Sequence, residues 1–369
     1  MAAPEHSPAF RQRRFLNWFP MGITYALLYM GRYNLTVAKN SLGELLRPSV
    51  TRRDEAEKAY ASAMALQDRL TRESPANDAY QQELARTHYN RGVLFGGIAE
   101  PNDAAFRTAE ADFREAIRVL EPLVQKKGNL QAPQDLARAY NNLGALLAQG
   151  ARDPEGLQAA RPFYERAIRT HEGLAARDPR NREFKFELAK FSNNYSELLR
   201  ELGAYGPAKE NSSRALGLLD ELVRPAPSLG IEQADAHNLR GRILQSEGSP
   251  AAVTEYRQAL TLFLSLARTD EAAGRPDFHL RYGDLLTNLA ALRRERPTGD
   301  EPRRLLSDAV RSYIEFGRRA GAGAPREARA VLDSLSRLMP ELSEADRASF
   351  TEPYDQLQKQ VGSRPVPDR

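Results

Sequence analysis

Small and aromatic residues recur at helical spacing through most of the chain. In each copy an alanine is followed four residues later by an aromatic or small residue, and three residues after that by another alanine. Spacings of four and three place these residues on one face of a helix, where alanine lets a neighbouring helix approach closely. The copies are Ala56/Tyr60/Ala63, Ala109/Phe113/Ala116, Ala160/Tyr164/Ala167, Ala208/Ser212/Ala215 and Ala252/Tyr256/Ala259. The pattern predicts a series of helices that each bury one face.

A recurring asparagine marks a second helix in each copy, upstream of the alanine pattern. These residues are Asn90, Asn142, Asn194, Asn238 and Asn288, at intervals of 52, 52, 44 and 50 residues. We interpret them as packing residues that form hydrogen bonds to the adjacent helix pair, because every copy carries one. Proline-containing breakers separate the helices, and no long stretch alternates with period two, so strands are not expected. Copy four has Arg240 where a small residue is expected, and a sixth copy around Tyr313 is degraded.

The pattern resembles the tetratricopeptide repeat over residues ~52–320. The residues that match the family consensus are Tyr140, Leu143, Gly144, Leu147, Ala160, Tyr164 and Ala167. The period near 50 is longer than the usual 34 and is similar to the long-period type that follows bacterial kinase domains; the run Leu188–Tyr205 shows this best. The resemblance implies an all-α solenoid of stacked antiparallel helix pairs that binds other proteins.

The N-terminal segment differs from the repeats. Twelve of the sixteen residues from Phe15 to Met30 are apolar, and three arginines precede them. A membrane anchor is the first interpretation, because extension to Ala38 reaches the ~20 residues that a membrane-spanning helix needs. A secretory signal peptide is an alternative, although no small-x-small cleavage site follows the apolar run. An amphipathic helix that caps the array is the third interpretation.

Residues ~13–46 resemble the first transmembrane helix of the organophosphate:phosphate antiporters of the major facilitator superfamily. Tyr25, Tyr29, Arg32 and Asn34 carry the resemblance. It implies that Arg32 binds a substrate phosphate, but no further apolar run follows, so transport is not supported. The segment is then a co-opted anchor or the scar of a gene fusion or misjoined reading frame. We predict a single-pass protein of the bacterial inner membrane; the resemblance implies a cytoplasmic N-terminus and repeats outside the cytoplasm.

These observations predict five parts. They are a basic tail at 1–14, a hydrophobic, transmembrane helix at 15–38, a solenoid of five to six helix pairs at 39–323, capping helices at 324–361 and a disordered tail at 362–369.

Charge and motifs exclude several kinds of function. The net charge of +4 comes from residues 1–53, which hold eight basic and two acidic residues, whereas the remainder is slightly acidic. No nucleic-acid partner is expected, because such proteins carry a basic stripe on the folded body. The absence of cysteine excludes disulfides and thiolate metal sites. We also find no metal-ligand spacing, phosphate-binding loop or nucleophile motif, so we predict no enzyme, cofactor or metal.

Candidate binding residues lie on the first helices, which line the concave face in the resembled family. Four residues before the asparagine stand Arg86, Arg138 and Lys190, and one residue before it stand Tyr89, Asn141, Asn193 and His237. Lys or Arg beside an amide or phenol suits an acidic tail or a C-terminal carboxylate. The alternative is a solvated charged face.

We therefore predict a non-enzymatic scaffold or adaptor, tethered to the membrane by its N-terminal helix, that holds a protein or peptide partner in its concave groove. Two alternatives remain open. One is a fragment or fusion derived from an organophosphate/phosphate transporter, in which Arg32 binds the phosphate. The other is the detached regulatory repeat region of a bacterial Ser/Thr kinase.

Overall fold

The protein is all-helical over the residues that its computed structural model describes, which are 53–101, 103–126, 131–224, 226–294, 301–320 and 325–362. The α-helices are α2 (Arg53–Glu73), α3 (Asp78–Gly96), α4 (Ala104–Val124), α5 (Gln131–Gly150), α6 (Pro154–Arg177), α7 (Arg182–Glu201), α8 (Tyr205–Val223), α9 (Gly230–Ser246), α10 (Ala252–Leu266), α11 (Asp270–Ala273), α12 (Pro276–Arg294), α13 (Glu301–Ala320), α14 (Pro325–Leu338) and α15 (Glu344–Gly362). Two short 3-10 helices, Pro227–Leu229 and Met339–Glu341, lie between them.

Five antiparallel helix pairs form the body of the array. They are α3/α4, α5/α6, α7/α8, α9/α10 and α12/α13, and each pair packs against the next. We call the earlier helix of each pair its first helix and the later one its second helix. The predicted all-α solenoid of stacked pairs is thus confirmed for the described part of the chain.

Polar side chains and glycines set where the helices begin and end. The side chains of Asp103, Asp153 and Asn181 each accept a hydrogen bond from a backbone N–H in the first turn of α4, α6 and α7. Such caps satisfy donors that have no partner within the helix. Gly203 and Gly248, with φ of 70° and 80°, end α7 and α9 in the left-handed conformation that glycine adopts without strain.

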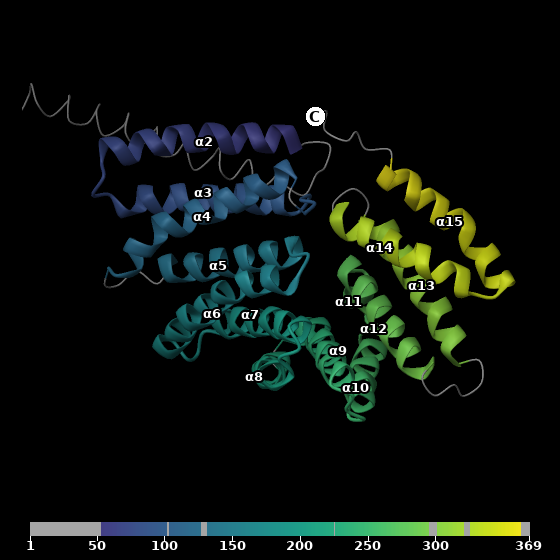
Figure 1. Ribbon diagram of the computed structural model, residues 1–369. Helices are drawn as coiled ribbons and strands as arrows, with labels where there is room; N and C mark the ends of the chain where they lie inside the picture. Colours follow the sequence, from purple (N-terminus) through teal and green to yellow (C-terminus); the bar gives the residue numbers. More distant parts are fainter. Residues whose placement is uncertain are drawn as a thin grey trace, which may run out of the picture.

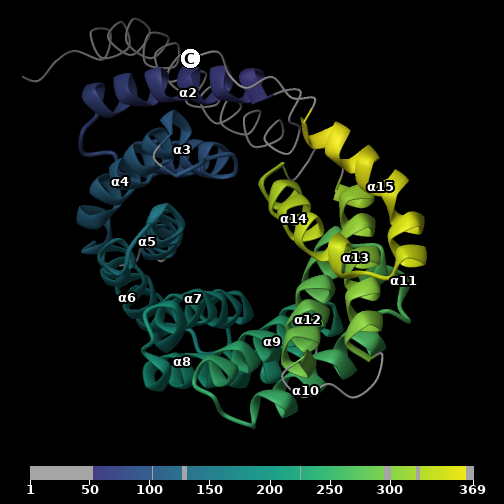
Figure 2. The same cartoon turned by 45° about the vertical axis from the view of Figure 1, so that its right-hand side comes forward.

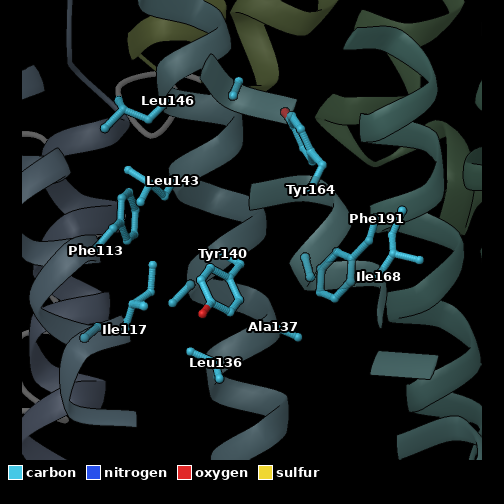
Figure 3. Packing of buried hydrophobic residues seen from close by; sticks show 14 of the residues in the cluster. Phe113, Ile117, Leu136, Ala137, Tyr140, Leu143, Leu146, Tyr164, Ile168 and Phe191 are labelled. Atoms are coloured by element: carbon cyan, nitrogen blue, oxygen red, sulfur yellow. The ribbon is translucent and has the colours of Figure 1, made fainter. Parts of the chain in front are cut away.

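The core consists of the small and aromatic residues that the pattern singled out. Tyr164 and Phe113 are almost fully buried, and the alanines on either side of each ring are buried completely. Figure 3 shows Phe113 and Ile117 on one side of α5, and Tyr164 and Ile168 on the other. The rings therefore join successive pairs into one continuous core, which the alanine and aromatic spacing predicts correctly.

A small residue on each first helix lets the aromatic ring of the second helix come close. A Cβ atom added at Gly144 would lie 3.1 Å from the Tyr164 ring, and one added at Gly241 would lie 2.6 Å from the Tyr256 ring. Copy four therefore keeps the expected glycine, displaced by one residue from Arg240. The ring and the glycine hold the two helices of a pair at short distance.

The array curves until its two described ends approach each other. In Figure 2 the first helices α3, α5, α7 and α12 lie on the inner side of the curve, and the second helices α4, α6 and α8 lie outside. Figure 1 shows α14 and α15 closing the end that faces α2 and α3. Arg329 of α14 pairs with Glu100, which follows α3, across 229 residues of sequence. The inner side therefore forms a concave face enclosed by the whole array.

The predicted membrane location is wrong for the part of the chain that the structure describes. No described helix combines the length and the apolar character that crossing a bilayer requires. The basic tail, the predicted hydrophobic helix at 15–38 and Arg32 lie outside the described residues.

Replacement of Gly241 by alanine tests the close approach within a pair. The added methyl would press on the fully buried Tyr256 ring, so Gly241→Ala is expected to lower the free energy of unfolding by about 1–3 kcal/mol. Gly217 lies in α8 with nothing within 4 Å of its added Cβ. Gly217→Ala is therefore the control, with an expected gain of about 0.5–1 kcal/mol. Urea unfolding followed by circular dichroism measures both, and equal effects would contradict this packing account.

Candidate functional site: the concave face

Neighbouring first helices are joined by a ladder of side-chain hydrogen bonds. In each bond the Nδ2 of an asparagine donates to an oxygen on the preceding first helix, at 3.0 Å. The bonds run from Asn142 to Tyr89, from Asn194 to Asn141 and from Asn288 to Asn238. The prediction that the recurring asparagines bond the adjacent helix pair is confirmed at these three junctions. Tyr89 and Asn141, both candidate binding residues, serve this ladder.

Ion pairs run beside the ladder at the first two junctions. Arg86 of α3 pairs with Glu83 at 2.9 Å and lies 3.7 Å from Asp135 of α5. Arg138 of α5 pairs in turn with Glu183 and Glu187 of α7. The charges of the first two candidate basic residues are thus taken up by carboxylates of the same helix and of the next copy.

Three glutamine amides donate hydrogen bonds to the carboxylates at these junctions. Asp135 is 9% exposed and accepts hydrogen bonds from Gln82 and Gln131. Gln134 donates to both Glu183 and Glu187 at 3.0 Å. Buried carboxylates are costly unless paired, so this network compensates for their burial between the first helices.

The later junctions use the same kind of contact with other residues. Glu197 of α7 lies between Arg200 and Arg242 of α9, and these two guanidinium groups outweigh its burial and hold its pKa below the ordinary range. At the next junction the acid again lies on the earlier first helix, because Asp235 of α9 accepts from Arg281 of α12 at 3.0 Å. Burial raises the pKa of Asp235.

Lys190 differs from the two arginines at equivalent positions. With the one-residue displacement of copy four, the residue equivalent to the partner of Arg138 is Glu232, which pairs instead with Arg275 at 3.2 Å. The Lys190 ammonium lies 5.5 Å from the centre of the Phe186 ring, and it forms no ion pair with any described residue. Its side chain is exposed on α7. A cation without a carboxylate partner in the described part of the chain is therefore exposed on the first helix α7.

Asn193 of α7 lies one helical turn further along. Its Oδ1 is buried and accepts no hydrogen bond from the described part of the chain. A buried acceptor that lacks a donor costs about 1–3 kcal/mol. We call Lys190, Asn193 and Asn194 the α7 centre; Asn194 is exposed and uses its Nδ2 in the ladder.

His237 faces the second helix of its own pair. Its Nδ1 lies 2.8 Å from the Glu255 carboxylate of α10, which also lies 3.0 Å from Arg240. Burial would raise the pKa of Glu255, but the hydrogen bond from His237 and the charge of Arg240 outweigh burial and lower it. The structure therefore does not bring His237 together with the other six candidate residues.

The first complete pair contains a cluster of the same kind that the sequence interpretation missed. His88 and Arg91 of α3 both contact the carboxylate of Asp112 on α4, at 2.8 and 2.7 Å. Asp112 is 2% exposed. The signal in the sequence was a histidine followed three residues later by an arginine, which occurs on both α3 and α9. These clusters tie the two helices of a pair together.

The described residues contain no group of three or more His, Asp or Glu side chains that could hold a metal ion.

The comparisons with known proteins concern structure alone. No protein-family model and no curated protein matches the chain. Among solved structures, the chain is similar to Nro1 of S. pombe, described as a nuclear import adaptor, with a TM-score of 0.49 and 14% identity over 84% of this chain and 94% of that one. It is similar to BtubC from P. vanneervenii, with a TM-score of 0.36 and 18% identity over 85% of this chain and 93% of that one. It is also similar to yeast Tom70, with a TM-score of 0.21 and 14% identity over 98% of this chain and 91% of that one. Likeness at this level does not bear on what the chain binds.

Substitution of Arg138 tests whether its ion pairs with α7 stabilise the fold or whether its side chain is only part of a solvated surface. Arg138→Gln leaves Glu187, whose side chain is 12% exposed, without its cation, so the free energy of unfolding is expected to fall by about 1–3 kcal/mol. Lys190→Gln, at the equivalent position of the next copy, is expected to change it by about 0.5 kcal/mol or less. Urea unfolding of both variants checks this; a neutral Arg138→Gln would show that the ion pairs contribute nothing.

Proposed function

We propose that the chain is a non-enzymatic adaptor that holds an extended segment of a partner protein along its concave face. The stacked pairs supply a continuous inner surface that is much longer than any one pair. Elongated concave surfaces of this kind suit extended polypeptides, which have many polar backbone groups to satisfy. The observation that carries the proposal is the α7 centre, where the exposed Lys190 ammonium forms no ion pair with the residues that the structure describes.

The α7 centre favours a partner segment with an acidic residue. Lys190, which is exposed on α7, supplies the charge for a carboxylate of that segment. Arg86 and Arg138 take no part in this proposal, because their carboxylate neighbours already neutralise them. One acidic residue placed opposite Lys190 is therefore sufficient, and a strongly acidic tail is not required.

Peptide selection on the folded protein tests the proposal and requires no identified partner. Random peptides are selected on the wild-type chain, and their dissociation constants are compared with those for Lys190→Glu and Lys190→Gln. The lysine reversal removes an attraction and adds a repulsion, so binding is expected to weaken at least about tenfold. Selected peptides are also expected to carry an acidic residue.

The matched control is Arg118→Glu on the outer helix α4. Among the described residues Arg118 pairs with Glu115 of the same helix alone, and it is 69% exposed, so its reversal is expected to leave peptide binding unchanged. Peptides that bind both α7 variants as well as the wild type would place the binding surface elsewhere.

A further inference from the structure

Two cavities lie at equivalent places in the array, away from the α7 centre. The first, of about 470 Å³, is lined by α4, α5 and α6. The second, of about 550 Å³, is lined by α8, α9 and α10. In both cases the second helix of one pair meets both helices of the next pair. The stacking of pairs therefore leaves a hollow of ligand size at this position.

One wall of the two cavities is alike. Glu121 stands eight residues after Phe113 on α4, and Asp220 stands eight residues after Ser212 on α8. Both carboxylates accept a hydrogen bond from the following first helix, Glu121 from the Tyr140 hydroxyl and Asp220 from Gln233. The acid is thus part of how each pair is joined to the next.

The side formed by the second helix of the next pair, α6 or α10, differs between the two cavities. Two and five residues after the buried tyrosine, the first cavity has Arg166 and Arg169, whereas the second has Gln258 and Thr261. The second cavity has a single guanidinium group, that of Arg257. The shared packing of the array therefore does not explain the pair of arginines in the first cavity.

Within the first cavity the two arginines have different surroundings. The Arg166 guanidinium lies over the Tyr140 ring at 5.7 Å and reaches Glu121 at 4.0 Å. Burial, together with the hydrogen bond to Glu121, raises the pKa of Tyr140 to about 12, so this hydroxyl keeps its proton and continues to donate. Glu121 is thus already engaged by one donor and one cation.

Arg169 is not engaged in this way. It is exposed and lines the cavity together with Thr170. Its charge acts on Glu165, four residues earlier on α6, but it forms no ion pair or hydrogen bond with the residues that the structure describes. Val124, Leu136 and the Tyr140 ring supply the apolar part of the lining. A guanidinium group without an ion pair, at the edge of a partly apolar hollow, is the arrangement that an anion with an apolar body fits.

We propose that the cavity between α4, α5 and α6 binds an oxyanion, a carboxylate or a phosphate monoester, carried on an apolar group. The guanidinium groups of Arg169 and Arg166 hold the oxyanion through charge-assisted hydrogen bonds, with the Thr170 hydroxyl as a further donor. The apolar group packs against Val124, Leu136 and the Tyr140 ring. This site is independent of the proposed peptide surface, because it uses none of the residues of the α7 centre.

Binding of two small probes to the full chain tests this site. Phenyl phosphate and benzoate share the apolar ring and differ in the oxyanion, so the tighter of the two identifies the preferred group. Saturable binding is expected for at least one of them, with shifts in the backbone amide resonances of Val124, Leu136 and Thr170. Arg169→Gln is expected to weaken that binding at least about tenfold.

Two references make the test decisive. Arg118→Gln removes an exposed arginine of α4 that lines neither of the two cavities, and this variant is expected to bind the probes as the wild type does. The amide resonances of Thr261 and Leu262, which line the second cavity, are expected to stay in place. The proposal is overturned if neither probe saturates at about 10 mM, if Arg169→Gln binds as well as wild type, or if the second cavity responds equally.

Discussion

The form of this protein depends on how each first helix is held against the next. Asparagine amides and ion pairs cross these junctions, from Asn142 to Tyr89, from Asn194 to Asn141 and from Arg138 to Glu187. Such contacts are directional, and the buried ones are costly if misaligned, so they specify the register of one pair on the next. Repeated along the array, one register gives one curvature, which brings α14 back towards α3. The concave face is a consequence of this polar ladder.

Apolar packing, unlike the polar ladder, acts mainly on the stability of the array. Within each pair the ring of the second helix lies against a small residue of the first, as Tyr164 does against Gly144, and alanines on both sides of the ring let the helices close. This burial supplies most of the stability, because hydrogen bonds add little once exchange with water is counted. His88, Arg91 and Asp112 add a buried polar contact to the first complete pair. Apolar packing within and between the pairs therefore supplies most of the stability, whereas the polar contacts at the junctions set the shape.

The sequence was informative wherever a residue's role is fixed by its own helix. The alanine and aromatic spacing identified the core, and the recurring asparagines identified the junctions. The surroundings of Arg86 and Arg138 were not predicted, because their carboxylates lie on another copy; yet Glu83, Asp135 and Glu187 recur at the same interval of 52 residues. His237 was misplaced because copy four is displaced by one residue, as Gly241 shows. The cavity beside Arg169 is formed by three helices, and no local pattern encodes it.

The most direct test of this account is a double-mutant cycle across the ladder between α5 and α7. Asn141→Ala, Asn194→Ala and the double variant are compared by urea unfolding of the full chain. If the amide bond between these residues fixes the junction, the two losses are coupled by about 0.5–1.5 kcal/mol. Losses that add to within about 0.3 kcal/mol would contradict the claim that the polar ladder sets how the pairs stack.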